Sequence, residues 1–95
     1  MKHIYLKLKN ALLLQRESIN IYIFGSALYS NFPNDIDVLI VYSDLNELPT
    51  IKHQLFQISL EYPLDIYYMT PEEVNELDFI NVTQAVELSS LTKAG

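Results

Sequence analysis

Residues 21–42 read IYIFGSALYSNFPNDIDVLIVY, and this stretch decides the fold. Its two ends are rich in β-branched and aromatic residues, which predicts one strand over residues 19–24 and a second over residues 36–42. The second strand is almost entirely apolar after Asp37, so we expect it to be central and covered on both faces. Between the strands, SALYS predicts one helical turn and NFPND predicts a bend.

Helical patterns lie on both sides of this pair of strands. Residues 3–17 carry apolar side chains at helical spacing, and residues 49–61 predict a second helix with Pro49 near its first turn. The inward stripe expected for the second helix consists of Ile51, Leu55, Ile58 and Phe56.

A third strand is predicted over residues 64–69, and the sequence that follows it has the signature of a helix start. Thr70 is a capping residue, Pro71 suits the first helical position, and Glu73 completes a capping box. This third helix is expected to carry Val74, Leu77, Phe79 and Ile80, and residues 85–88 predict a short edge strand. The expected fold is α/β (α+β): a small mixed sheet of three to four strands flanked by helices, in a single domain over residues 1–95.

Composition excludes several classes of protein. Hydrophobic residues make up 49% of the 95 residues, which is too many for a disordered chain. Twelve acidic and six basic residues leave a net charge of −6, so we expect no direct binding of duplex nucleic acid. The absence of Cys excludes disulfides and thiolate chemistry. No apolar run is long enough to span a membrane, so we expect a cytoplasmic protein that does not bind membranes.

The run Leu12-Leu13-Leu14 makes the first helix more apolar than one sheet face requires. One interpretation is a helix that is buried on most of its surface. The other is a face that docks a second chain. The sequence leaves both open.

Gly25 and Ser26 stand where the first strand ends and the helical turn begins. Glycine permits a positive φ and a close approach of a ligand to the backbone. Ser26 offers a hydroxyl beside the free N–H groups of a helix start, which is a ready site for a phosphate. A Gly-Ser pair after a strand is also a common plain turn, and both interpretations remain.

Three carboxylates occupy the starts of two apolar strands. Asp35 and Asp37 are two residues apart, so on a strand they share one face, and Asp65 lies near the start of the third strand. If the second and third strands are neighbours, Asp65 lies beside the other two. Three such acids at a Gly-Ser turn suit two Mg²⁺ ions, with Mn²⁺ as an alternative, in a phosphoryl-transfer site. Alternatively, Asp35 caps the turn and Asp65 solubilises a strand edge.

The order of these features resembles the polymerase-β-type nucleotidyltransferase superfamily: Gly-Ser, eight residues, Asp-Ile-Asp on an apolar strand, then a lone Asp on the next strand. With PLDIYYMTPEE after the helix, the chain is most similar to the minimal nucleotidyltransferases, over about residues 19–73. The resemblance implies transfer of a nucleoside monophosphate, most readily AMP from ATP, to a protein or small acceptor. It implies that Asp35 and Asp37 bind both metal ions. It also implies that Asp65 holds the catalytic ion and helps to deprotonate the attacking hydroxyl. By the same resemblance, Gly25 and Ser26 hold the β- and γ-phosphates of ATP or another NTP.

The resemblance also implies a protein partner. Several minimal members act as antitoxins of a helical HEPN-type toxin, so a basic, helical partner and a homo- or hetero-oligomer are expected. Many relatives carry an Arg just after Gly-Ser, whereas no Lys or Arg lies between Arg16 and Lys52 here. This departure supports an alternative, a catalytically weak or inactive nucleotidyltransferase fold that acts as an antitoxin or scaffold by stoichiometric binding. Lys52 either reaches the triphosphate from its helix or is a solvated helix residue. Tyr29 and Phe32 either stack on the base of the nucleotide or fill the small core of their own loop.

Overall fold

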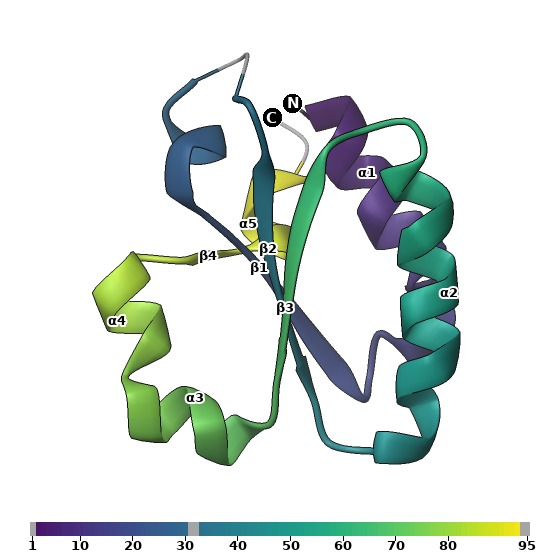
Figure 1. Cartoon of the computed structure of the whole chain (residues 1–95), viewed down its shortest axis with the longest axis vertical. Helices are drawn as coiled ribbons and strands as arrows, with labels where there is room; N and C mark the ends of the chain where they lie inside the picture. The colour runs from purple at the N-terminus through teal and green to yellow at the C-terminus, as the bar shows by residue number, and fades with distance from the viewer. Residues whose placement is uncertain (1, 31–32, 94–95) are drawn as a thin grey trace.

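A four-stranded mixed sheet with strand order β3-β2-β1-β4 runs through the computed structural model, which describes residues 2–30 and 33–93 (Figure 1). β1 spans Ile19–Phe24, β2 spans Ile36–Tyr42, β3 spans Leu64–Met69 and β4 spans Val86–Glu87. β1 pairs antiparallel with β2 and with β4, whereas β2 and β3 are parallel. The expected mixed sheet flanked by helices is confirmed.

Helices cover both faces of the sheet. They are α1 (Lys2–Ala11), α2 (Leu48–Ser59), α3 (Pro71–Leu77), α4 (Phe79–Thr83) and α5 (Leu88–Leu91), with 3-10 turns η1 (Leu13–Gln15), η2 (Gly25–Leu28) and η3 (Leu45–Glu47). α1 and α2 lie on one face, and α3 and α4 lie on the other (Figure 1). Within residues 2–30 and 33–93, no helix is both long enough and apolar enough to cross a bilayer.

β2 is buried on both faces, as its apolar sequence predicts. Val38 and Ile40 are fully buried in the core against α1 and α2. Leu39 is also fully buried, and it points to the opposite face because side chains alternate along a strand. The central position of β2 between β1 and β3 explains this burial.

The first helix is shorter than the sequence indicates. α1 ends at Ala11 instead of continuing to residue 17, and η1 follows it. The Ser18 hydroxyl donates to the Gln15 carbonyl at 3.0 Å and to Glu47 Oε2 at 2.8 Å, which fixes the turn into β1. Leu12 is buried, but Leu13 is 44% and Leu14 is 87% exposed, and all three follow the end of α1, so the run does not belong to a helix that is buried on most of its surface.

Three smaller expectations also needed correction. Ile51, Leu55 and Ile58 do form the buried stripe of α2, but Phe56 is exposed because it lies about 100° around the helix from Leu55. The third helix divides at Asp78, which adopts a left-handed conformation. The last strand is limited to Val86–Glu87 because α5 begins at the next residue.

The predicted capping box of the third helix is confirmed. The Glu73 N–H donates to Thr70 Oγ1 at 3.3 Å, and the Thr70 N–H donates to Glu73 Oε1 at 3.0 Å. Two N–H groups at the helix start, which no helical carbonyl can reach, are thereby satisfied. This contact fixes the direction in which the chain leaves β3.

Candidate functional site

Asp37 and Asp65 lie side by side at the starts of two neighbouring strands. β2 and β3 are parallel, and Asp37 is the register partner of Asp65. The Ile36 N–H donates to the Pro63 carbonyl at 2.9 Å, which locks this register at the first residues of the two strands. Adjacent strands are about 4.8 Å apart, so two carboxylates at one register position on the same face are direct neighbours.

Gly25 lies directly against this pair. It follows β1, whose last residue, Phe24, is the register partner of Asp37. Gly25 has φ +76°, a left-handed conformation that glycine adopts without strain. A Cβ at this position would overlap Asp37 Oδ2 and would stand 3.2 Å from Asp37 Cγ. Glycine is therefore required here both by backbone conformation and by the close approach of Asp37.

Asp35 lies just outside the strand that the sequence assigns to it. It occupies a bend and is exposed, and β2 begins at the next residue, Ile36. Its negative charge nevertheless contributes to raising the pKa of Asp37, so it is close enough to act on that carboxyl group. Asp37 and Asp65 thus lie side by side at one end of the sheet, and Asp35 lies at the bend just before β2.

The pKa of Asp37 is raised above its ordinary value. Partial burial is the largest cause, followed by the negative charges of Asp65 and Asp35 and by a hydrogen bond with Asp65. Each of these disfavours the ionised form of Asp37. The site therefore holds negative charge at a cost in free energy, which a bound cation would offset.

Aromatic side chains lie next to the carboxylates on the same sheet face. Phe24, Tyr67 and Phe79 form an aromatic cluster with ring centroids 5.1 to 6.2 Å apart. The Tyr67 hydroxyl donates to Asp65 Oδ2 at 3.3 Å, and the charge of Asp65 raises the pKa of Tyr67. The sequence analysis did not single out Tyr67, although its position two residues after Asp65 on one strand was a signal that the two share a face.

The donor set suits a hard divalent cation. Carboxylate oxygens are the ligands that Mg²⁺ and Mn²⁺ prefer, and Asp37 and Asp65 present them side by side. Among the residues that the structure describes, no three His, Asp or Glu side chains converge into a ready-made metal site. The acids that could hold an ion are thus one adjacent pair with Asp35 next to it.

The structure does not bring Lys52 to the carboxylates. Its amino group lies 5.2 Å from the centre of the Tyr68 ring, and Tyr68 packs against the core on the α2 side of the sheet. Asp65 and Tyr68 are three residues apart on β3, so they point to opposite faces. Lys52 is therefore an exposed helix residue across the sheet from the acids.

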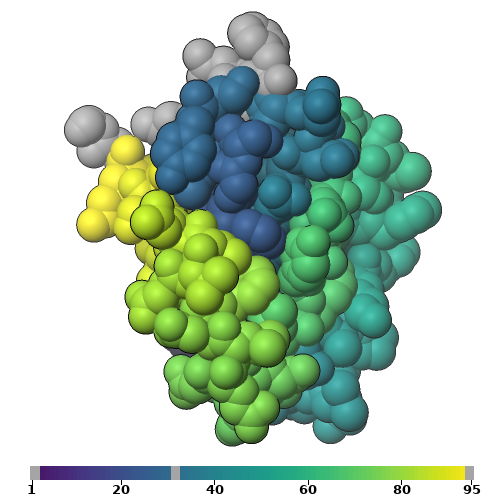
Figure 2. Space-filling view, turned by 60° about the vertical axis from the view of Figure 1, so that its left-hand side comes forward, coloured from purple at the N-terminus to yellow at the C-terminus, as the bar shows by residue number. Residues whose placement is uncertain are grey.

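The remaining sequence candidates lie at the same end of the sheet. Figure 2 shows η2, which contains Ser26, above α3 and α4 on the face that carries the acids. Ser26 is exposed, and its carbonyl accepts from the N–H groups of Tyr29 and Ser30. Tyr29 is 78% exposed, so it does not fill a core within its loop. Phe32 is outside the described residues.

Comparison with known proteins adds no assignment: no family model matches the chain, and no curated protein matches it.

Proposed function

We propose that this protein is a Mg²⁺-dependent nucleotidyltransferase that moves a nucleoside monophosphate, most readily AMP from ATP, to a hydroxyl group of a protein or small acceptor. One observation carries the proposal: Asp37 and Asp65 share a register position on parallel strands, and Gly25 is packed directly against Asp37. A stable fold gains nothing from a partly buried Asp37 beside a second carboxylate, the exposed Asp65. A site that binds divalent cations and a polyphosphate does.

Asp35, Asp37 and Asp65 would hold the metal, as two ions in the arrangement that the resemblance implies. When bound, the metal supplies positive charge to the phosphates and lowers the pKa of the attacking hydroxyl. The raised pKa of Asp37 supports this assignment, because a bound cation would favour the ionised form that partial burial and the charges of Asp65 and Asp35 disfavour. Tyr67 would orient the Asp65 carboxylate through its hydrogen bond.

The transfer conserves atoms and charge in one displacement. The acceptor hydroxyl oxygen attacks the α-phosphorus of the nucleotide, the bond from that phosphorus to the bridging oxygen breaks, and pyrophosphate leaves. Asp65 takes the hydroxyl proton. Gly25 and Ser26 would hold the β- and γ-phosphates through backbone N–H groups and the Ser26 hydroxyl, while the missing side chain at Gly25 leaves room for Asp37.

The test is transfer of label from each α-labelled NTP in the presence of Mg²⁺, with the protein alone and with the protein encoded beside it. Asp37→Asn is compared with Glu17→Gln, which removes the same charge from an exposed position. We expect label on the acceptor with wild-type protein and Glu17→Gln, and at least a hundredfold less with Asp37→Asn. Absence of transfer to any acceptor, together with absence of metal-dependent NTP binding, contradicts the proposal.

A second candidate function has its own supporting observation. Lys52, the cation that the sequence analysis considered as a ligand of the triphosphate, lies across the sheet from the acids and does not supply the missing basic clamp. The chain would then be an antitoxin or scaffold that neutralises a basic, helical partner of the HEPN type by binding it. Neutralisation by a double variant, Asp35→Asn with Asp37→Asn, at wild-type strength would favour this function over catalysis.

A further inference from the structure

In the part of the chain that the structure describes, part of the outer edge of β1 has no strand beside it. β4 pairs with β1 only at Tyr22 and Ile23. The next pair in this register would join Ile21 to Leu88, but Leu88 begins α5 and leaves the sheet direction. Within the described chain, no strand pairs with residues 19–21 on that side. This segment therefore presents unpaired backbone groups, which can template another strand.

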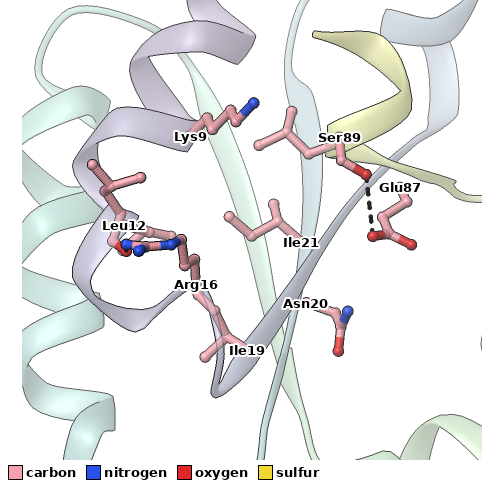
Figure 3. Close-up of a pocket in the computed structure, with 10 residues that line it drawn as sticks. Lys9, Leu12, Arg16, Ile19, Asn20, Ile21, Glu87 and Ser89 are labelled. Atoms are coloured by element: carbon pink, nitrogen blue, oxygen red, sulfur yellow. Dashed lines mark hydrogen bonds between the residues drawn. The ribbon is translucent and has the colours of Figure 1, made fainter. Parts of the chain in front are cut away.

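A cavity lies against this free segment. Its volume is about 150 Å³, and Leu12, Ile19, Ile21 and Leu88 are among its apolar lining residues (Figure 3). A cavity of this size accepts about one benzene-sized group, whereas pockets for drug-sized ligands usually exceed 300 Å³. It suits a single apolar side chain better than a whole small molecule. The free strand edge and this cavity together are called the β1 groove below.

The charge around the β1 groove is opposite in sign to that of the rest of the molecule. Lys9 and Arg16 line it, and Figure 3 shows both on the α1 side of the cavity. Residues 2–16 contain four of the six basic residues and no acid. Glu87 lines the other side, where the Ser89 hydroxyl donates to it at 3.2 Å. An acidic ligand therefore meets two cations on one wall.

The same charges argue against a second copy of this chain in the groove. A two-fold symmetric pairing brings the same patch of both copies together, so the four cations of the two grooves would meet only two acids, the two copies of Glu87. Like charges across an interface oppose association. The occupant that fits is a different chain of acidic character.

We propose that the β1 groove binds an extended, acidic segment of a different protein, which adds to β1 as a strand and places one large apolar side chain in the cavity. This inference is independent of the proposed catalysis. The groove lies at the Ile19 end of β1, whereas the carboxylates lie at the Phe24 end. A partner held in the groove would leave Asp37 and Asp65 accessible. This acidic partner would differ from the basic partner that the resemblance implies.

The probe for the test is a fluorescein-labelled heptapeptide in which Phe is flanked by Val on both sides and by Asp and Glu at both ends. Binding is measured by fluorescence anisotropy at low salt, and the position by amide chemical shifts of the labelled protein. Two control peptides replace the acids by Lys or the Phe by Gly. Lys9→Glu is compared with Lys52→Glu, because both change the same charge on an exposed helix position.

We expect saturable binding of the acidic peptide, shifts concentrated at residues 19–21 and Leu88, and weaker binding of both control peptides. Lys9→Glu should weaken binding by about three- to tenfold and Lys52→Glu by less than about twofold, and added salt should reduce the difference. Equal losses in the two variants, shifts confined to β3, or no saturation at millimolar peptide would overturn the proposal. Concentration-dependent shifts at residues 19–21 without peptide would also overturn it, and would assign the groove to a second copy.

Discussion

Asp37 is the residue at which stability and function oppose each other. It is the second residue of the most buried strand of the molecule and yet carries a carboxyl group with two acids near it. A Val or Asn at this position would be easier to accommodate in the free protein. The energetic cost of Asp37 is understandable if it binds a ligand that the folded chain alone does not supply.

The first prediction concerns the pH dependence of this cost. Because the folded pKa of Asp37 is raised, the native state binds more protons than the unfolded state between the unfolded pKa, about 3.9, and the folded value. The stability contributed by Asp37 is therefore greatest below that window and is lost as pH rises through it. Asp37→Asn should raise the free energy of unfolding at pH 7 by about 0.2–1 kcal/mol, the usual size of a repulsive cross-strand pair.

Urea unfolding of the wild type and of Asp37→Asn between pH 3 and pH 8 measures this difference. The gap should narrow at low pH, where Asp37 is protonated and neutral. Millimolar Mg²⁺ should stabilise the wild type more than the variant. A gap that stays constant over the whole pH range would show that the charge of Asp37 is not its cause.

The second prediction concerns Gly25. Gly25→Ala forces a Cβ into a left-handed backbone position and against the Asp37 carboxyl group. The backbone strain alone should cost about 1–2 kcal/mol of unfolding free energy, and Asp37 must rotate away. Ser26→Ala, one residue later and exposed, should change stability by less than about 0.5 kcal/mol.

Thermal unfolding gives the stability of both variants, and Mn²⁺ titration gives their metal affinity. Gly25→Ala should lose metal affinity because its effect passes through Asp37. If Gly25→Ala binds Mn²⁺ as tightly as Ser26→Ala, the close packing of Gly25 on Asp37 has no role in the site.

At the scale of elements, the parallel pair β2–β3 creates the site, and α2 is the connection that makes this pairing feasible. Parallel neighbours need a long crossover, and α2 supplies it by burying Ile51, Leu55 and Ile58 against the sheet. An antiparallel β3 would have brought the Met69 end, rather than Asp65, to the start of β2. The helix that contributes no residue to the site thus determines which carboxylates meet.

The third prediction concerns the start of α3. Thr70→Ala removes the side-chain acceptor of the Glu73 N–H, and it should cost about 1 kcal/mol of unfolding free energy. Thr50→Ala is the matched control, since Thr50 is exposed within α2, where Ala is the better helix former. Urea denaturation that finds equal effects for the two substitutions would contradict a specific capping role for Thr70.

At the scale of the whole molecule, the helices on the two faces of the sheet are packed against it to different extents. The face under α1 and α2 contains most of the core residues, whereas α3 and α4 have no fully buried residue. The aromatic cluster is the principal described contact that joins α4 to the sheet, through Phe79 against Phe24. The elements that border the carboxylates are therefore the less firmly attached layer.

The fourth prediction follows from this inequality. Amide protons of α3 and α4 should exchange through local opening at a lower free energy than those of β1 and β2, which should require global unfolding. Native-state hydrogen exchange in low denaturant distinguishes the two. Phe79→Ala should accelerate exchange in α4 and leave β2 nearly unchanged. Equal protection of α3 and β2 would show that the whole molecule opens as one unit.

The sequence by itself determined the strands at residues 19–24, 36–42 and 64–69, the helix start at Thr70, and the stripe of Ile51, Leu55 and Ile58. Each of these depends on local propensity, capping or periodicity, which neighbouring residues encode. The sequence also determined that Asp37 and Asp65 would meet if their strands were neighbours.

Only the tertiary structure decided the features that depend on distant contacts. It ended the first helix at Ala11, placed Lys52 across the sheet from the acids, and set Tyr67 against Asp65. It also left the outer edge of residues 19–21 without a strand partner in the described chain, beside a cavity, because the chain turned into α5 after two residues of β4. The physical reason is that strand order and packing settle which side chains share a face, whereas a local pattern fixes only the direction of each side chain within its own element.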